Sequence, residues 1–274
     1  MEAKIVIVIQ ARMGSSRLPG KVMLPIMGES LLARMTERLQ RVTYPVTLMI
    51  ATSERAEDDI IADEAEYLMI PYYRGSAGDL LDRHYRAAKM LNAQYVLKIP
   101  SDCPLIDYRI VDRALSYFFK PCATFDYVSN LHPATYPDGN DVEIMTMDCL
   151  ERTWKGATKV LEREHTTPYI WENPNMFTVG NVEWETGLDY SMSHRFTIDY
   201  LKDYEFIKRV FEELYPINPD FSCEDILALL DKDPTIYAIN AEYAGVNWYR
   251  NHLQELKTVS AAHTKQAPKH ELSK

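Results

Sequence analysis

The hydrophobic pattern of the first 100 residues alternates between strand-like and helix-like segments. Five consecutive β-branched residues, Ile5 to Ile9, leave the first strand without a polar face, so it needs cover on both sides, as a central parallel strand has. A helix from Ser30 to Leu39 and a strand from Val46 to Ala51 complete one βαβ unit. The same alternation predicts helices over 58–68 and 79–91, and strands over 70–73 and 95–99. The predicted fold is α/β, with a mostly parallel sheet and helices on both faces.

The regular alternation of strand-like and helix-like segments is interrupted from about residue 127 to 182. Short strand-like runs, an amphipathic helix over 150–161 and a proline-rich turn over 132–139 predict a small α+β insert. Helical periodicity returns over 204–214 and 226–230. The tail is polar and has almost no large apolar side chain. We therefore expect a single domain over 1–257 and a disordered tail over 258–274.

Composition narrows the class of protein. The 274 residues carry a formal net charge of -10, which argues against a general affinity for nucleic acid or for an anionic membrane surface. No apolar run approaches the roughly 20 residues that span a bilayer, and the amino terminus lacks a signal-peptide pattern, so we expect a cytoplasmic protein. The four cysteines are not paired as C-x-x-C, so we expect small buried side chains rather than disulfides or a zinc site; they are Cys103, Cys122, Cys149 and Cys223.

The loop after the first strand combines small residues with cations. A glycine lets the backbone approach an oxyanion, serine offers hydroxyl and N–H donors, and cations neutralise a polyphosphate. The small residues are Gly14, Ser15 and Ser16, and the cations are Arg12, Arg17 and Lys21. Two common phosphate motifs are absent: Val22 follows Lys21 where a Walker A loop needs a hydroxyl, and the glycine spacing is not that of a dinucleotide-binding loop. The pattern predicts a different kind of phosphate loop.

Two carboxylates follow strand-like runs. Asp102 comes after the strand 95–99, and Asp199 ends a β-rich run over 195–199. The carboxyl ends of parallel strands line one crevice, so Asp102 can face the phosphate loop. Mg²⁺ prefers one or two carboxylates together with phosphate oxygens and water, and we therefore expect Mg²⁺ there. The alternatives are that Asp102 is a turn residue and that Asp199 caps a helix.

The segment from Ala11 to Lys21, A-R-x-G-S-x-R-x-P-x-K, resembles the amino-terminal signature of cytidylyltransferases that activate acidic sugars. These form the CMP-sialic acid and CMP-Kdo synthetase superfamily, and the resemblance is strongest to its SpsF-like spore-coat polysaccharide branch, from Lys4 to about Phe221. It implies a Rossmann-like nucleotide-diphospho-sugar transferase fold of the glycosyltransferase-A type. Segments around Asp102 and Asp199 match the metal-binding segments of this superfamily, although the residues after Asp199 depart from its usual pattern.

The resemblance also assigns binding roles. The segment at Arg74 and Gly75, with Arg83, would recognise cytosine and ribose, although pairing of Arg83 with Asp79 along one helix explains that arginine nearly as well. Nucleotide contacts are expected from Ala11, Arg12, Met13, Gly14, Ser15, Arg17, Lys21, Arg74, Gly75, Arg83, Ser101 and Asp102.

Two further segments of the insert match the SpsF-like proteins, G-x-D-V-E at 139–143 and E-R-E-H at 162–165. They suggest an acceptor pocket in which acids bind hydroxyl groups and cations or a histidine bind a carboxylate. The alternative is that His165 is a structural histidine with local partners. The acceptor-binding candidates are Asp141, Glu143, Arg163, His165 and Arg195.

The implied reaction is CMP transfer from CTP to an acidic sugar, a ulosonic or sialic-like acid, with release of pyrophosphate, for surface polysaccharide biosynthesis. Arg12 and Lys21 would neutralise phosphate charge, and Asp102 and Asp199 would hold Mg²⁺. Two alternatives remain open. A glycosyltransferase that uses a nucleotide sugar would need a D-x-D motif, which Asp199 does not form, and a non-catalytic nucleotide-binding protein would keep the same pocket.

A homodimer is the expected assembly. The insert concentrates aromatic and aliphatic residues in more surface than a small subdomain readily covers alone. These residues are Tyr169, Ile170, Trp171 and Phe177.

Overall fold

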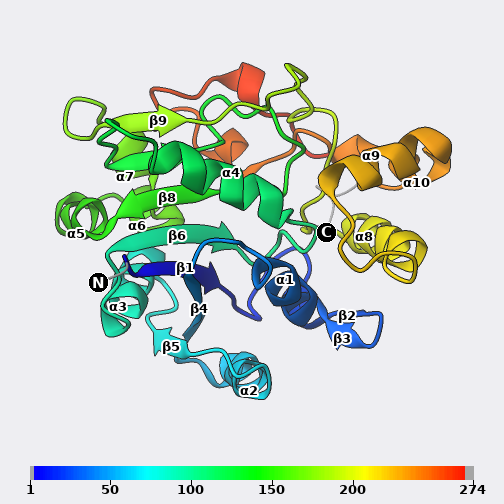
Figure 1. The fold of residues 1–274 in the computed structure, drawn as a ribbon, viewed down its shortest axis with the longest axis horizontal. Helices are drawn as coiled ribbons and strands as arrows, with labels where there is room; N and C mark the ends of the chain where they lie inside the picture. Colours follow the sequence, from blue (N-terminus) through cyan, green and yellow to red (C-terminus); the bar gives the residue numbers. More distant parts are fainter. Residues whose placement is uncertain (1–2, 269–274) are drawn as a thin grey trace.

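The structure is a computed structural model, and it describes residues 3–268. Its seven-stranded sheet has the order β5-β4-β1-β6-β8-β7-β9 (Figure 1). Strand β1 pairs in parallel with β4 and β6, and β4 pairs in parallel with β5, whereas β8 is antiparallel to both β6 and β7. The strands are β1 (Ile5–Gln10), β4 (Val46–Ser53), β5 (Tyr72–Gly75), β6 (Tyr95–Pro100), β7 (Tyr127–Ser129), β8 (Glu143–Thr146) and β9 (Val179–Asn181). A separate hairpin pairs β2 (Pro25–Ile26) with β3 (Glu29–Ser30).

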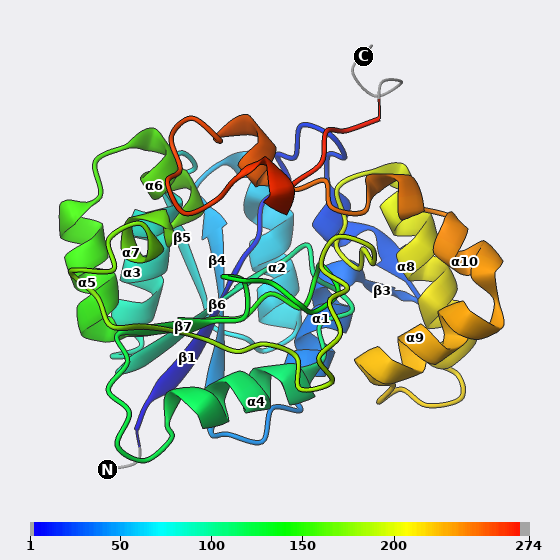
Figure 2. The same ribbon diagram turned by 90° about the horizontal axis from the view of Figure 1, so that it is seen from above.

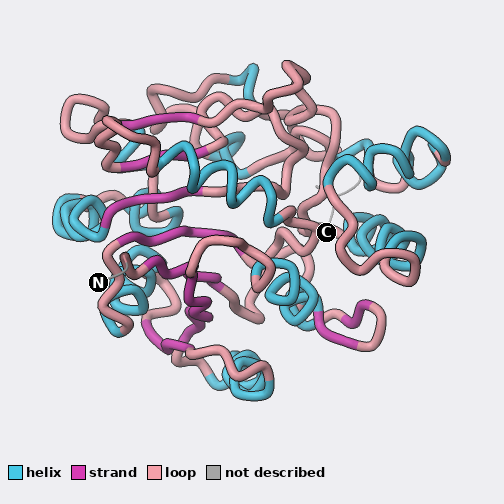
Figure 3. The backbone as a smooth tube through the Cα atoms, viewed as in Figure 1, coloured by secondary structure: helices cyan, strands magenta, loops and turns pink. Residues whose placement is uncertain are grey.

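Strand β1 lies inside the sheet, as its apolar run predicts. Ile5, Ile7 and Ile9 belong to the hydrophobic core on one face, and Val6 and Val8 belong to the core on the other. The first core is built with α1 (Leu31–Leu39), α2 (Asp59–Tyr67), α4 (Tyr108–Phe118), α8 (Leu201–Leu214), α9 (Cys223–Lys232) and α10 (Pro234–Ala238). The second is built with α3 (Leu80–Met90), α5 (Met147–Gly156), α6 (Val160–His165) and α7 (Pro168–Trp171). Helices therefore cover both faces, which confirms the predicted α/β architecture (Figure 3).

The segment 127–182 differs from the expected insert in two respects. Strands β7, β8 and β9 extend the main sheet, so the segment is part of the same layer. The helix predicted over 150–161 is two helices, α5 and α6, because Ala157 adopts an extended conformation after Gly156. A Cβ atom at Gly156 would lie 2.4 Å from the Tyr169 hydroxyl, so a side chain at this break would require Tyr169 to move.

The predicted β-rich run over 195–199 forms no strand of the sheet. Arg195 makes a single bridge to Asp138, and α8 begins at Leu201, three residues before the predicted start. The Asp203 carboxylate accepts hydrogen bonds from the Asp199 and Tyr200 N–H groups at 2.9 and 3.0 Å. Asp203, and not Asp199, therefore satisfies the free backbone groups at this helix start.

Three of the four residues expected at a dimer contact are buried inside this chain, and the fourth, Tyr169, is half-buried. Ile170, Trp171 and Phe177 pack in one core with Leu256 and Val259 from the carboxyl-terminal part. The physical reason given for a homodimer is therefore lost, because these side chains are already covered.

The predicted disorder of 258–274 is wrong over 258–268. Thr258 and Val259 are held against the domain, and residues 261–263 form a short 3-10 helix. Residues 269–274 lie outside the described part of the chain. Cys103, Cys149 and Cys223 are buried as expected, whereas Cys122 is exposed. No helix within residues 3–268 is long and apolar enough to cross a membrane.

Candidate active site

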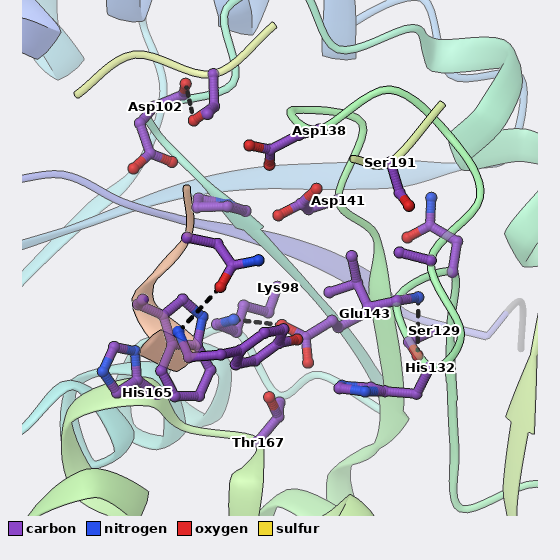
Figure 4. A pocket seen from close by; sticks show the side chains of 18 of the residues that line it. Lys98, Asp102, Ser129, His132, Asp138, Asp141, Glu143, His165, Thr167 and Ser191 are labelled. Carbon is purple, nitrogen blue, oxygen red and sulfur yellow. Dashed lines mark hydrogen bonds and ion pairs between the residues drawn. The ribbon is translucent and has the colours of Figure 1, made fainter. Parts of the chain in front are cut away.

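A cavity of about 1130 Å³ opens at the carboxyl ends of β1 and β6. The phosphate loop, the turn after β6 and the segment 127–143 all contribute to its wall. Figure 4 shows Asp138, Asp141 and Glu143 on this wall together with Lys98. The structure thus brings together loops that are far apart in the sequence.

The phosphate loop lies at one end of this cavity. Its backbone is anchored where Met13 N donates to Asp58 Oδ1 at 2.6 Å and Gly20 N donates to Met13 O at 2.9 Å. Gly20 has a φ of 71°, a left-handed conformation that favours glycine. The loop residues on the cavity wall are Ala11, Arg12, Gly14, Ser15, Ser16, Arg17 and Lys21, and of the predicted loop contacts Met13 alone is not among them.

Lys21 is buried at the centre of a charge network. Its ammonium group donates to Asp102 Oδ2 at 3.0 Å, to Asp199 Oδ1 at 2.9 Å and to the Ile198 carbonyl at 2.6 Å. Burial alone would lower the pKa of Lys21, but the two carboxylates outweigh it and raise the pKa. Lys21 is therefore charged, and it joins both predicted metal-binding acids.

Asp199 is the more heavily paired of the two acids. Its Oδ1 also lies 2.6 Å from Arg17, and its Oδ2 lies 3.2 Å from Arg195. Burial would raise the pKa of Asp199, but Lys21, Arg17 and Arg195 hold it well below the usual range. The carboxylate is thus ionised and surrounded by cations.

Asp102 keeps one oxygen available. Its Oδ2 binds Lys21, whereas among residues 3–268 its Oδ1 receives only a weak contact from the Cys103 thiol at 3.8 Å. A single carboxylate oxygen beside a phosphate loop fits Mg²⁺, which takes its other ligands from phosphate and water. Asp199 fits less directly, because a metal there would displace a cation. Within residues 3–268 no group of three or more histidine, cysteine, aspartate or glutamate side chains is arranged to hold a metal ion.

Arg12 is the available cation of the loop. It is exposed, and its guanidinium makes no hydrogen bond or ion pair with any residue of 3–268. It can therefore meet a phosphate without first leaving a protein partner. Ser101, beside Asp102, also lines the cavity.

Two buried polar atoms near the end of β1 have no partner in the described chain. Arg83 donates from Nη1 to the Ser76 carbonyl at 2.9 Å, but its Nε has no acceptor. Gln10, which ends β1, has an Oε1 without a donor. Both residues line the cavity, and burial lowers the pKa of Arg83 to about 10. The alternative pairing of Arg83 with Asp79 is not observed, because Arg163 occupies that carboxylate. Gln10 was missed, although a polar residue closing an all-apolar strand was an available signal.

Arg74 and Gly75 lie away from the cavity. The Arg74 guanidinium donates to the carbonyls of Ser53 and Arg55 at 3.0 and 2.9 Å, and it pairs with Asp59 at 2.6 Å. Gly75 is paired with Ser53 between β5 and β4. Neither residue lines the cavity, so the structure gives them a role in joining a loop to the sheet edge.

The two acids expected to bind acceptor hydroxyls do line the cavity. Glu143 forms a short ion pair with Lys98, and its other oxygen accepts from the Tyr127 hydroxyl at 2.6 Å. Burial opposes ionisation of Glu143, but Lys98 outweighs it and lowers the pKa. Burial, followed by repulsion from Asp102, raises the pKa of Asp141 to about 6. Burial also raises the pKa of Asp138, whereas Arg195 opposes that rise.

The three residues predicted to bind the acceptor carboxylate have other roles in the structure. Arg163 lies off the cavity wall and binds Asp79 at 2.6 Å, which ties α6 to the start of α3. His165 lines the cavity, but burial lowers its pKa to about 3, so it is neutral at physiological pH.

Arg195 is buried beside the cavity within a group of acids. It binds Asp203 at 2.9 Å, Asp138 at 3.1 Å and Asp199 at 3.2 Å. Burial would lower the pKa of Arg195, but these acids raise it. The guanidinium is charged and already saturated with carboxylate partners.

Several residues that line the cavity were not predicted from the sequence. Lys98 could have been found, because a lysine inside an otherwise apolar strand needs a partner or a ligand. Asp138 lies in the proline-rich turn over 132–139, and only the fold shows that this turn lines the cavity. The aromatic residues from the carboxyl-terminal segment gave no local signal; they are Trp248 and Tyr249.

Comparison with known proteins shows the family to which the sequence is related. Residues 6–226 match the sequence model of the family described as Cytidylyltransferase. An uncharacterised protein of Methanocaldococcus jannaschii is 36% identical over 238 residues, 87% of this chain and 95% of that protein. The spore coat polysaccharide biosynthesis protein SpsF of Bacillus subtilis is 28% identical over 84% of this chain and 95% of its own.

A solved structure agrees with these sequence matches. A cytidylyltransferase from Leptospira borgpetersenii superposes with a TM-score of 0.80 at 35% identity, over 86% of this chain and 97% of that one. Both the sequence and the arrangement of the sheet are therefore shared with this group. The chain belongs to the cytidylyltransferase family.

Proposed function

We propose that this protein transfers CMP from CTP to a sugar-like acceptor and releases pyrophosphate. The observation that carries the proposal is the convergence of Arg12, Arg17 and Lys21 with Asp102 and Asp199 at one end of the cavity. Cations there suit a triphosphate, and a carboxylate with an available oxygen suits the metal that accompanies it.

The residues of the loop would do most of the catalytic work by placing charge. Arg12 would bind phosphate oxygens directly, and Lys21 and Arg17 would turn toward the triphosphate from their present partner, Asp199. Charge that develops on the departing pyrophosphate is then neutralised by groups already in position. Mg²⁺ held at Asp102, with Asp199 as a second ligand once its cations have moved, would polarise the α-phosphate.

Base choice is proposed to depend on Gln10 and Arg83. Cytosine presents an amino donor at N4 and acceptors at N3 and O2, whereas uracil presents an acceptor at O4 and a donor at N3. The unpartnered Gln10 Oε1 can accept from the amino group, and the unpartnered Arg83 Nε can donate to a ring or carbonyl acceptor. This pair of atoms therefore favours cytosine over uracil.

The acceptor is proposed to be an acidic sugar of the ulosonic or sialic-like class, as the resemblance to that superfamily suggests. Lys98 is the cation at the acceptor end, and it would bind the sugar carboxylate while it remains paired with Glu143. Asp141 would accept from a sugar hydroxyl. A product of this kind would serve surface polysaccharide biosynthesis in the cytoplasm.

Pyrophosphate release tests the proposal. The wild-type protein with CTP, MgCl₂ and a panel of sugars should release pyrophosphate in step with a CMP-linked product seen by mass spectrometry. A glycosyltransferase would instead release a nucleotide from a nucleotide sugar, and a non-catalytic protein would bind CTP without either release. The homodimer expected from the sequence is tested separately by light scattering, where a monomeric mass at micromolar concentration would contradict it.

A further inference from the structure

The segment from Gly245 to Lys265, here called the C-terminal strap, closes one side of the cavity. Figure 2 shows it, in orange to red, crossing between α6 and α8. Several of its side chains line the same cavity as the phosphate loop; they include Trp248, Tyr249, His252 and His263. The strap is therefore part of the site wall.

The strap is a closed loop with firm anchors. Lys265 N donates to the Gly245 carbonyl at 2.7 Å, so the chain leaves and returns at one point. Midway, the Glu172 carboxylate at the end of α7 accepts from Lys257 N at 2.9 Å and from the Thr258 hydroxyl at 2.6 Å. Leu256, between these anchors and the cavity-lining residues, is buried in the core. These contacts hold the strap in place while its inner side faces the cavity.

The strap meets the acceptor end of the cavity. The Trp248 ring stacks on His165 of α6, with centroids 3.8 Å apart and planes within 10°. Figure 4 shows His165 near Lys98 and Glu143 and apart from Asp102. Trp248 thus belongs to the part of the wall that lies away from the metal-binding acid.

The strap also lies outside the sequence that defines the family. The family match ends at residue 226, and eighteen residues, 227–244, separate it from the start of the strap. The phosphate loop and both metal-binding acids fall within the match, whereas Trp248 does not. The part of the wall supplied by the strap can therefore differ between members while the nucleotide chemistry stays the same.

We propose that the C-terminal strap selects the acceptor and that Trp248 is its contact with the sugar-like ring. The assignment rests on the proposed function. A tryptophan face covers the apolar C–H surface of a sugar ring, while nearby polar groups orient the hydroxyls. The neutral, stacked His165 supports the Trp248 ring, and Glu172 is a positioning residue that keeps the strap in place.

The test separates acceptor binding from nucleotide binding. In steady-state assays with CTP and an acceptor that supports pyrophosphate release, such as 3-deoxy-manno-octulosonate, Trp248→Ala should raise the acceptor KM at least tenfold. Its kcat should stay within about threefold, and calorimetry should give a Kd for CTP within about twofold of wild type. Trp248→Phe should recover most of the lost affinity because it keeps an aromatic face.

Two more variants keep the test decisive if Trp248→Ala fails to fold. Glu172→Gln should raise the acceptor KM. It should also make the Trp248 ring more accessible to acrylamide, measured as quenching of the Trp248 fluorescence, which is taken as the difference from Trp248→Phe. Lys257→Ala is the matched control, because its side chain is exposed and its anchoring N–H remains; it should behave as wild type.

Each outcome is informative. An active wild-type enzyme whose acceptor KM is unchanged in Glu172→Gln, and in Trp248→Ala where that variant folds, would overturn the strap assignment alone. A wild-type protein that releases no pyrophosphate with any acceptor would overturn the proposed function, and the strap assignment would fall with it.

Discussion

The Lys21 ammonium lies 2.9 Å from Asp199 Oδ1, although 178 residues separate the two in the chain. A cation expected to bind phosphate and an acid expected to bind metal are thus partners of each other. Both are buried in the same network. Nucleotide binding would replace this ion pair by two new ones, phosphate with Lys21 and metal with Asp199, so neither charge is left without a partner.

Replacement of Lys21 by alanine should impair both turnover and stability. The loss of a contact that strengthens in the transition state costs about 3 kcal/mol, roughly a hundredfold in rate. The sequence alone predicts almost no change in melting temperature, but the burial of Lys21 between two carboxylates predicts a loss of about 2 kcal/mol, or roughly 4–8 °C. Pyrophosphate assays and thermal melts measure the two effects. Lys208→Ala, on an exposed face of α8, is the control.

Asp102→Asn should abolish turnover and leave the fold intact. The amide keeps the shape of the side chain but lacks the charge that Mg²⁺ needs. Circular dichroism should match the wild type, and titration with MgCl₂ should no longer restore activity. Asp148→Asn, an exposed acid on α5, controls for a simple change in net charge. Near-normal pyrophosphate release by Asp102→Asn would remove this residue from the mechanism.

Gln10→Leu should weaken discrimination between bases. If Gln10 Oε1 accepts from the cytosine amino group, its loss should reduce CTP affinity about tenfold, or about 1.4 kcal/mol, and change UTP affinity little. Calorimetry with CTP and UTP measures both constants. Arg74→Lys, whose guanidinium is held by Ser53 and Arg55 outside the cavity, should keep the wild-type preference. If Arg74→Lys weakens the preference for CTP and Gln10→Leu leaves it unchanged, Arg74 and not Gln10 recognises the base.

Asp141→Asn should stabilise the protein without ligand in neutral solution. Burial raises the pKa of Asp141 to about 6, so between about pH 4 and 6 the folded state binds more protons than the unfolded state. Stability is therefore lost as the pH rises through this window. The amide does not ionise and escapes the loss, so its melting temperature should exceed that of wild type by roughly 2–4 °C at pH 7.5, for about 1 kcal/mol. The difference should vanish near pH 4. Thermal melts from pH 4 to 8 provide the measurement, and a difference independent of pH would contradict the assignment.

Local patterns in the sequence were enough for much of the framework. Ile5 to Ile9 specify a strand covered on both faces, since any exposed face would leave apolar side chains in water. The Ser30 hydroxyl caps α1 by accepting from Ala33 N at 2.9 Å, as the start of the helical pattern indicated. The position of the phosphate loop after that strand and of Asp102 after β6 also followed from sequence, because strand ends in parallel sheets meet at one edge.

The partners of the charged residues were decided only by the tertiary structure. Arg74, Arg163 and Arg195 occur in motifs of binding type, yet each is engaged by an acid that the fold places beside it. A local pattern shows which residue carries a charge, but burial and distance to residues far along the chain decide whether that charge is available.

The C-terminal strap illustrates the same division more strongly. Its sequence is polar enough toward the end to predict disorder, and its order comes from Glu172 and the Gly245–Lys265 hydrogen bond. Glu172 follows α7 and lies 86 residues from Thr258 in the chain, so no local pattern in the strap reveals this contact. The sequence by itself therefore determined the central strand, the loop that follows it and the position of Asp102 after β6. The partners of the buried charges and the order of the strap were determined by long-range packing, whose free energy depends on surfaces that no single segment contains.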